Sequence, residues 1–207
     1  MWRPPVEAHL MTAANGPQNV ISGLEAAARA ARGSRGLPPV ERWNPPDRGE
    51  LDMRIAANGT WSYLGSAIER PALVRLFSSI LRRDGDRYVL VTPAEKFGIV
   101  VDDAPFLAVE LEAVGDGEAQ RLVFRTNVDD TMVAGPAHAL RVEINPITGE
   151  PRPYVHVRGG LEALVTRAVF YELVSLSQTR DTDRGPILGV WSDGVFFPLG
   201  PVPQEVG

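Results

Sequence analysis

One short segment carries side chains able to recognise an anion, spaced for one face of a β-strand. Four of them occupy alternate positions: Arg152, Tyr154, His156 and Arg158. Because side chains alternate across a strand, these groups are expected to share one face. Gly159 and Gly160 follow, directly before a predicted helix, and free amide groups at a helix start favour an anion. The segment therefore predicts an anion-binding site.

A plainer interpretation of this segment stays open. The row could face solvent on an edge strand, with the glycines serving only a tight turn. Arg75 extends the first interpretation, because it interrupts an apolar helical stripe and is expected to face a neighbouring unit or an anion. Its alternative is simple exposure. Within the predicted site, Tyr154 or Trp61 is expected to stack on a base, and His156 to tune affinity with pH.

Catalytic signatures are weaker than this binding pattern. Glu110 and Glu112 fall on one strand face, a spacing that a hydrolase with paired carboxylates could use. The preferred interpretation is a cross-strand ion pair, with Glu112 opposite Arg121. Ser78 and Ser79 have no flanking elbow glycines, and no glycine-rich phosphate loop occurs. We therefore predict no catalytic residues.

Metal ligands do not cluster in the sequence either. His9, His138 and His156 each lack a second histidine at ligand spacing. Asp181 and Asp183 faintly resemble a calcium loop, but that loop's twelfth position is Ser192 rather than glutamate. The sequence therefore predicts neither a metal site nor a cofactor.

Composition narrows the class of protein. The 207 residues carry a formal net charge of −5, which disfavours a surface for duplex nucleic acid. Cysteine is absent, so disulfides, zinc fingers and thiol nucleophiles are excluded and a reducing compartment is expected. No apolar run reaches the roughly 18 residues of a membrane span. We expect a cytoplasmic protein.

The site must be positioned by two compact units, each an antiparallel sheet with a packed helix. Residues 1–36 are expected to form a disordered tail and an alanine-rich helix, capped by Ser22 and Glu25. Residues 37–94 predict a small unit made of a hairpin at Asn58-Gly59, a helix over 71–83 and a strand.

Residues 95–203 predict a larger, β-rich unit. Regularly spaced turns separate its strands, and 161–177 predicts one long helix. A second hairpin is expected at Asp193-Gly194. Strands, a helix and a strand follow in both units, which indicates a duplicated α+β core.

Six segments in order also resemble a known family. They are VERWNPP, LDMRIAANGTWSYLGSAI, LVRLFSSILRR, YVLVTPAEK, GEPRPYVHVRGGLEAL and GVWSDGVFFPLG, spanning about residues 37 to 200. Together they resemble the bacterial family called domain of unknown function twelve eighty-five. The chain departs from that pattern at Glu50 and Leu51, within an expected Gly-Asp-Ile-Asp, and at Ala57, where an acidic residue is usual.

The resemblance implies a duplicated core whose second unit is superficially like a pleckstrin-homology fold. It also implies a ligand pocket between the units, a nucleotide-like ligand and a role in signalling. We therefore expect a non-enzymatic regulatory protein that binds a small anionic ligand at the interface. The alternatives are a module that recognises an acidic segment of a protein partner and, third, a hydrolase using Glu110 or Glu112.

Overall fold

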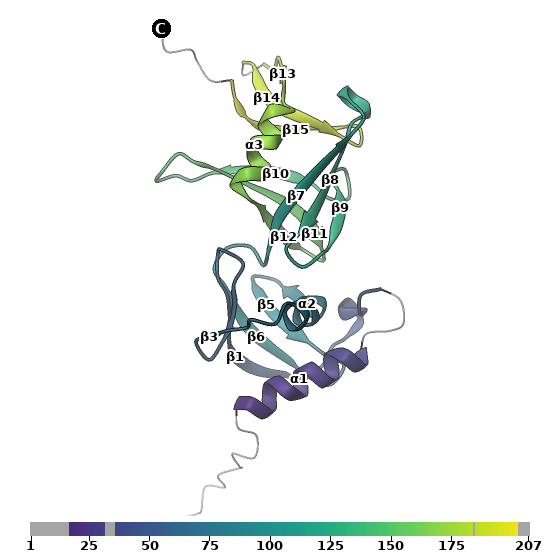
Figure 1. Cartoon of the computed structure of the whole chain (residues 1–207), viewed down its shortest axis with the longest axis vertical. Helices are drawn as coiled ribbons and strands as arrows, with labels where there is room; N and C mark the ends of the chain where they lie inside the picture. The colour runs from purple at the N-terminus through teal and green to yellow at the C-terminus, as the bar shows by residue number, and fades with distance from the viewer. Residues whose placement is uncertain (1–16, 32–35, 184, 203–207) are drawn as a thin grey trace, which may run out of the picture.

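The computed structural model describes residues 17–31, 36–183 and 185–202, and these form two units stacked along the long axis (Figure 1). The first unit contains α1 (Pro17–Ala31), η1 (Val40–Arg42), β1 (Asp47–Ile55), β2 (Trp61–Tyr63), β3 (Ser66–Ala67), α2 (Pro71–Ser79), β4 (Leu81–Asp84), β5 (Arg87–Val91) and β6 (Lys96–Val101). The second contains β7 (Phe106–Val114), η2 (Gly117–Ala119), β8 (Arg121–Thr126), β9 (Thr131–Val133), β10 (Leu140–Ile144), β11 (Pro151–Arg158), β12 (Leu161–Val165), α3 (Arg167–Ser175), β13 (Gln178–Arg180), β14 (Ile187–Ser192) and β15 (Val195–Pro201). The chain is α+β.

The first sheet has the order β3-β2-β1-β6-β5-β4. Its predicted hairpin is confirmed, since β1 and β2 pair antiparallel with Ile55 opposite Trp61. The turn follows the expected chemistry: Gly59 adopts φ +80°, and the Asn58 side chain accepts a hydrogen bond from the Thr60 amide at 3.0 Å. Helix α2 begins at Pro71, as predicted.

Helix α2 ends earlier than the predicted 71–83. The hydroxyls of Ser78 and Ser79 bond back to carbonyls three residues earlier, a local competition with helix geometry. The chain then becomes strand, and Leu81 and Arg82 pair with Leu90 and Val89 of β5. A strand partner therefore overrides the apolar helical stripe.

Strand β6 was predicted within the 95–203 unit but belongs to the first sheet. It pairs parallel with β1 and antiparallel with β5. A parallel partner is reached only through a long connection, so local patterning does not reveal it. The prediction of purely antiparallel sheets is wrong for the same reason, because β7 and β12 are also parallel.

The two sheets repeat one topology. Read from β4, the first sheet has the order β4-β5-β6-β1-β2-β3. The last three strands of the unit therefore stand beside its first three. The second sheet, β10-β11-β12-β7-β8-β9, has the same order and the same parallel first and sixth strands. The helices do not repeat, since α2 precedes the fourth strand and α3 follows the sixth. The likeness therefore lies in the sheets, not in the predicted strand-helix-strand order.

The segment 161–177 is not one helix. Gly159 and Gly160 both have positive φ, +49° and +73°, which suits a two-residue hairpin turn. Strand β12 follows, with alternating burial from Leu161 to Val165, and pairs antiparallel with β11. Helix α3 starts only at Arg167. Leucine and alanine favour a helix in isolation, but the glycine turn places the segment in the sheet.

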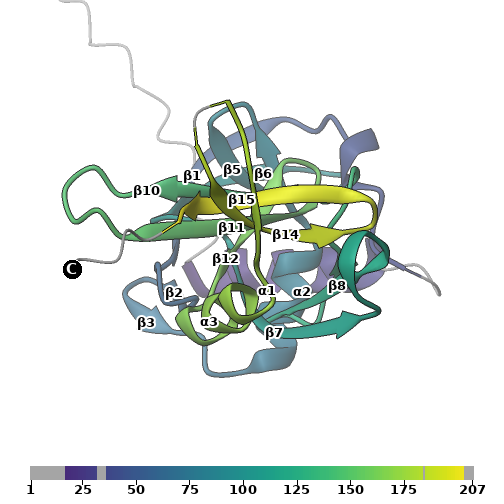
Figure 2. The same cartoon turned by 90° about the horizontal axis from the view of Figure 1, so that it is seen from above.

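A third sheet, β13-β14-β15, lies across the far end of the second unit (Figures 1 and 2). The predicted hairpin at Asp193-Gly194 joins β14 to β15. Buried Ser192 attaches this sheet to the second one: its hydroxyl accepts from the Leu122 amide at 2.9 Å and donates to the Ala134 carbonyl at 2.6 Å. Helix α3 lies between the two sheets.

Helix α1 packs against the first unit beside α2. It buries Leu24 and Ala28 completely, in agreement with the thin apolar stripe of its sequence. It begins at Pro17, so Ser22 lies inside the helix and the predicted capping box is wrong. The predicted tail and His9 fall on residues 1–16, outside the described residues. Across the described ranges, no helix combines the length and apolarity needed to cross a bilayer.

Candidate functional site

Two residues of the row predicted on β11 contact the connector between the two units. Arg152 and the hydroxyl of Tyr154 both bond to the carboxylate of Asp103, the tyrosine at 2.8 Å. Asp103 lies in the short segment that joins β6 to β7. Burial and this hydrogen bond raise the pKa of Tyr154 to about 12, so the phenol stays protonated at neutral pH.

Arg158 joins the two units directly. Its guanidinium pairs with Asp130 and donates to the Ser78 carbonyl at 2.8 Å. It also lies 5.0 Å from the ring centroid of Phe106. Arg75 is exposed, which was one of its two predicted alternatives, and it also pairs with Asp129 of the other unit at 3.2 Å. Both arginines are therefore already matched by carboxylates, and neither is a vacant phosphate ligand.

Three predicted site residues cannot play the expected parts. Gly159 and Gly160 form the β11–β12 turn, so the helix start that was to supply free amides there does not exist. Trp61 is 1% exposed in the core of the first unit, and stacking on a ligand would require it to leave that core.

His156 lies on the same row, but its contacts are with residues of its own unit, the second. Its Nδ1 is 3.1 Å from the Ala137 carbonyl, and its ring centroid is 5.8 Å from that of His138. It does not line the hollow described next.

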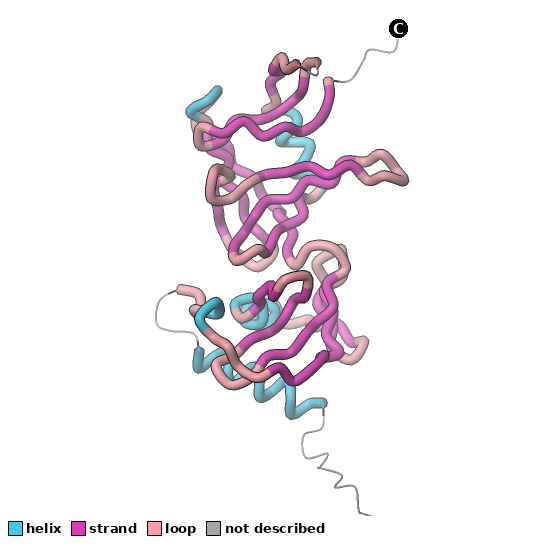
Figure 3. The backbone as a smooth tube through the Cα atoms, turned by 180° about the vertical axis from the view of Figure 1, so that it is seen from behind, coloured by secondary structure: helices cyan, strands magenta, loops and turns pink. Residues whose placement is uncertain are grey.

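A polar hollow of about 180 Å³ lies where the units meet. It is lined from both sides by Arg83, Tyr88, Asp103, Ala104, Arg141, Glu143, Tyr154 and Glu162. Only Tyr154 of this set was predicted. Arg83 and Glu162 were each predicted to lie in a helix. They converge because each lies instead in a β-hairpin, and the two hairpins meet in space. Figure 3 shows the units approaching each other through such turns.

The hollow contains the same pair of residue types twice. On β4 and β5, Arg83 lies opposite Tyr88, with its guanidinium 5.6 Å from the ring centroid. On β10 and β11, the topologically equivalent strands, Arg141 lies opposite Tyr154 at 4.4 Å. Each unit therefore contributes one arginine stacked over one tyrosine.

The two arginines differ in how well they are neutralised. Arg141 donates to both Glu162 oxygens at 2.7 and 2.6 Å and also pairs with the more exposed Glu143. The Arg141 hydrogen bonds lower the pKa of Glu162, so both groups are charged at neutral pH. Arg83 has a much weaker partner, the fully exposed Asp86 at 3.9 Å. Arg83 is thus the cation in the hollow most accessible to a new anion.

The preferred interpretation of Glu110 and Glu112, a cross-strand ion pair, holds for one carboxylate but not with the predicted residues. Glu110, rather than Glu112, is the one that pairs across strands, and its partner is Arg125 rather than Arg121. The bond to Arg125 lowers the pKa of Glu110. Within the described part of the chain, no three histidine, aspartate or glutamate side chains gather as they would to hold a metal ion.

These features define a two-unit α+β protein with repeated sheet topology and a polar hollow between the units. The chain belongs to the DUF1285 family. Residues 38–104 match the model described as domain of unknown function (DUF1285), N-terminal domain. Residues 105–199 match that of protein of unknown function (DUF1285), C-terminal domain. The border between them falls in the connector that carries Asp103.

Two solved structures are similar to this chain. One is a DUF1285 family protein from Silicibacter pomeroyi DSS-3, with 53% identity over 92% of this chain and 97% of that chain, and a TM-score of 0.80. The other is a DUF1285 family protein from Shewanella baltica OS155, with 28% identity over 60% of this chain and 91% of that chain, and a TM-score of 0.48. No protein with a curated description matches.

Proposed function

We propose that this protein is a non-enzymatic regulator that binds a small anionic, nucleotide-like ligand in the hollow between its units. The observation that carries the proposal is the convergence of two arginine-over-tyrosine pairs, one from each unit. The free face of a stacked guanidinium is a platform for a base, and its edge donates to phosphate. A ligand that contacts both pairs would stabilise one arrangement of the units, as a signalling role requires.

The anionic part of the ligand is assigned to Arg83 and to the outer edge of Arg141. Glu143 is 60% exposed, so displacing it from Arg141 costs little. Displacing Glu162 or Asp103 would cost more, because both carboxylates are less exposed. Glu162 accepts two hydrogen bonds from Arg141, and Asp103 is bonded to both Arg152 and Tyr154. Arg75, Arg152 and Arg158 keep a structural part in this proposal.

We also propose that the repeated strand order reflects duplication of one ancestral core, and that the second unit is superficially like a pleckstrin-homology fold. Support comes from the matching order and direction of all six strands. Superposing the two sheets of an experimental structure tests it, and mismatched strand directions or registers would contradict it.

Calorimetric titration of the full chain with mono-, di- and cyclic nucleotides tests the binding proposal. Arg83→Met should weaken binding by about tenfold, the order expected for one charge-assisted hydrogen bond. Arg48→Met is the matched control, since Arg48 is exposed, weakly paired with Glu95 at 3.5 Å and not among the hollow's lining residues. Absence of heat with every nucleotide at millimolar concentration, or equal losses in both variants, would refute the proposal.

A further inference from the structure

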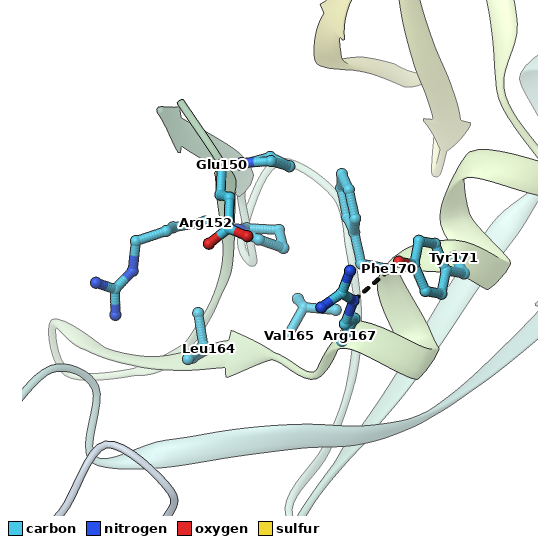
Figure 4. A pocket seen from close by; sticks show the side chains of 9 residues that line it. Glu150, Arg152, Leu164, Val165, Arg167, Phe170 and Tyr171 are labelled. Atoms are coloured by element: carbon cyan, nitrogen blue, oxygen red, sulfur yellow. Dashed lines mark hydrogen bonds between the residues drawn. The ribbon is translucent and has the colours of Figure 1, made fainter. Parts of the chain in front are cut away.

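A second cavity lies in the second unit, away from the hollow between the units. It has a volume of about 340 Å³ and opens between β11, β12 and the first turns of α3 (Figure 4). Such a volume is within the range of small-molecule sites. The cavity belongs entirely to the β-rich unit.

The walls of this cavity are mostly apolar. Its apolar side chains come from three elements: Pro151, Pro153, Leu164, Val165 and Phe170. Ile144 pairs with Pro151 across the β10–β11 ladder and is 55% exposed, so it extends the apolar surface along the projecting hairpin (Figures 1 and 3).

One cation of the cavity has no carboxylate partner. Arg152 turns its guanidinium away from Arg167 in Figure 4 and pairs with Asp103. Arg167 instead donates to the hydroxyl of Tyr171 at 2.8 Å, and in the described part of the chain no carboxylate lies within 4.0 Å of it. Glu150 also lines the cavity. The hydrogen bond to Tyr171 is the main cause that raises the pKa of Arg167, and the charge of Glu150 raises it least.

Most arginines of the described residues differ from Arg167 in their pairing. Thirteen arginines from Arg29 to Arg158 have a carboxylate partner in the described residues. Arg42 and Arg180 also lack one in the described residues, but neither lines this cavity, and Arg180 stacks on Trp191 and Phe196. Of these three, Arg167 is the one that lines the cavity, where its guanidinium lies over the Tyr171 ring, 5.6 Å from the centroid.

We infer that this cavity binds a small amphipathic monocarboxylate, with its apolar body against Leu164 and Phe170 and its carboxylate on Arg167. Arg167 attracts the ligand's carboxylate, and Glu150 on the same lining disfavours a second acidic group. This inference does not depend on the nucleotide proposal, since none of the hollow's arginines lines the cavity.

The test titrates the ¹⁵N-labelled full chain with 4-phenylbutyrate and, separately, with its neutral analogue 4-phenylbutanamide. We expect backbone amide shifts in α3, in β12 and at the start of β11, and a carboxylate affinity roughly fivefold to tenfold above that of the amide. Arg167→Met, which keeps an apolar stem, should abolish this preference while leaving amide binding unchanged.

Arg180→Met is the matched control, because it removes one unpaired and exposed arginine that does not line the cavity. It should leave the preference intact. Leu164→Trp should fill the cavity and block both probes, and should it fail to fold, Arg167→Met still decides. The inference is overturned by equal affinity for the two probes, by a preference that survives Arg167→Met, or by shifts confined to residues outside the cavity. Shifts of the same amides caused by protein concentration alone would assign the face to a second copy of the chain, and would also overturn it.

Discussion

Replacement of Arg158 by methionine tests whether one guanidinium holds the two units together. Its side chain is 22% exposed and that of its partner Asp130 is 21% exposed. Methionine keeps most of the apolar contact but removes the charge and all donors. The substitution leaves the Asp130 carboxylate and the Ser78 carbonyl without this partner at the junction.

The expected cost is built from three contributions. The lost hydrogen bond to Ser78 accounts for about 1 kcal/mol. The lost contact with Phe106 adds about 0.5 to 1 kcal/mol. Removing one partner of a fully buried ion pair costs roughly 3 to 5 kcal/mol. Because both side chains here are about one-fifth exposed, we expect about 1 to 2 kcal/mol. The sum is about 3 kcal/mol.

Urea unfolding, followed by circular dichroism and tryptophan fluorescence, measures this cost. The matched control is Arg121→Met, because Arg121 is 58% exposed and 4.0 Å from its partner Asp193, a pair worth less than about 0.5 kcal/mol. A double cycle with Asp130→Asn should give a coupling energy of about 1 to 2 kcal/mol. If Arg158→Met costs no more than Arg121→Met, the reasoning about the junction is wrong.

Three further predictions concern stability. Hydrogen bonds from Arg82 and Lys96 lower the pKa of Asp84 to about 2, so the ionised carboxylate adds up to about 2 kcal/mol to the free energy of unfolding above pH 4, and this is lost as the pH falls toward 2. Asp84→Asn should therefore reduce the dependence of the unfolding free energy on pH, measured from about pH 2.5 to 6. The same pH dependence in the variant and the original chain would contradict this. Gly59→Ala should cost about 1 kcal/mol more than Gly65→Ala, because both have positive φ but only a Cβ at Gly59 would lie 2.9 Å from the side-chain ends of Leu107 and Asn127, which would have to shift. Equal melting temperatures of the two variants would exclude this clash. Ser192→Ala should cost about 2 to 3 kcal/mol by leaving the Leu122 amide and Ala134 carbonyl unpaired, against under 0.5 kcal/mol for the exposed Ser175→Ala in the same urea assay.

Local turn chemistry made the hairpins predictable. Asn58-Gly59 and Asp193-Gly194 supply positive φ between alternating segments, and both hairpins form where expected. The same rule applied to Gly159-Gly160 would have indicated a third hairpin. Leu161 to Val165 carries residues that favour a helix in isolation, and pairing with β11 across this turn makes the segment a strand with alternating burial.

The hollow was harder to predict because its members meet only through tertiary structure. Arg83 and Tyr88 are neighbours in a hairpin, and Arg141 and Tyr154 in another, but the sequence does not state that the hairpins face each other. The alternation on β11 did place Tyr154 there. The alternation also indicated the cations Arg152 and Arg158. It did not reveal that Asp103 and Asp130 neutralise them, because these partners lie 49 and 28 residues away in the sequence.

This neutralisation changes what binding at the junction would mean physically. A ligand anion would not fill an empty positive site but would exchange with a carboxylate already present, so its affinity reflects the difference between two ion pairs. The exchange is cheapest at Arg83 and at the Glu143 side of Arg141, whose present partners are exposed. It is most costly at Arg158, where the released Asp130 would stay at the junction. Selectivity at this site would therefore follow the exposure of the carboxylate that leaves, rather than the number of arginines nearby.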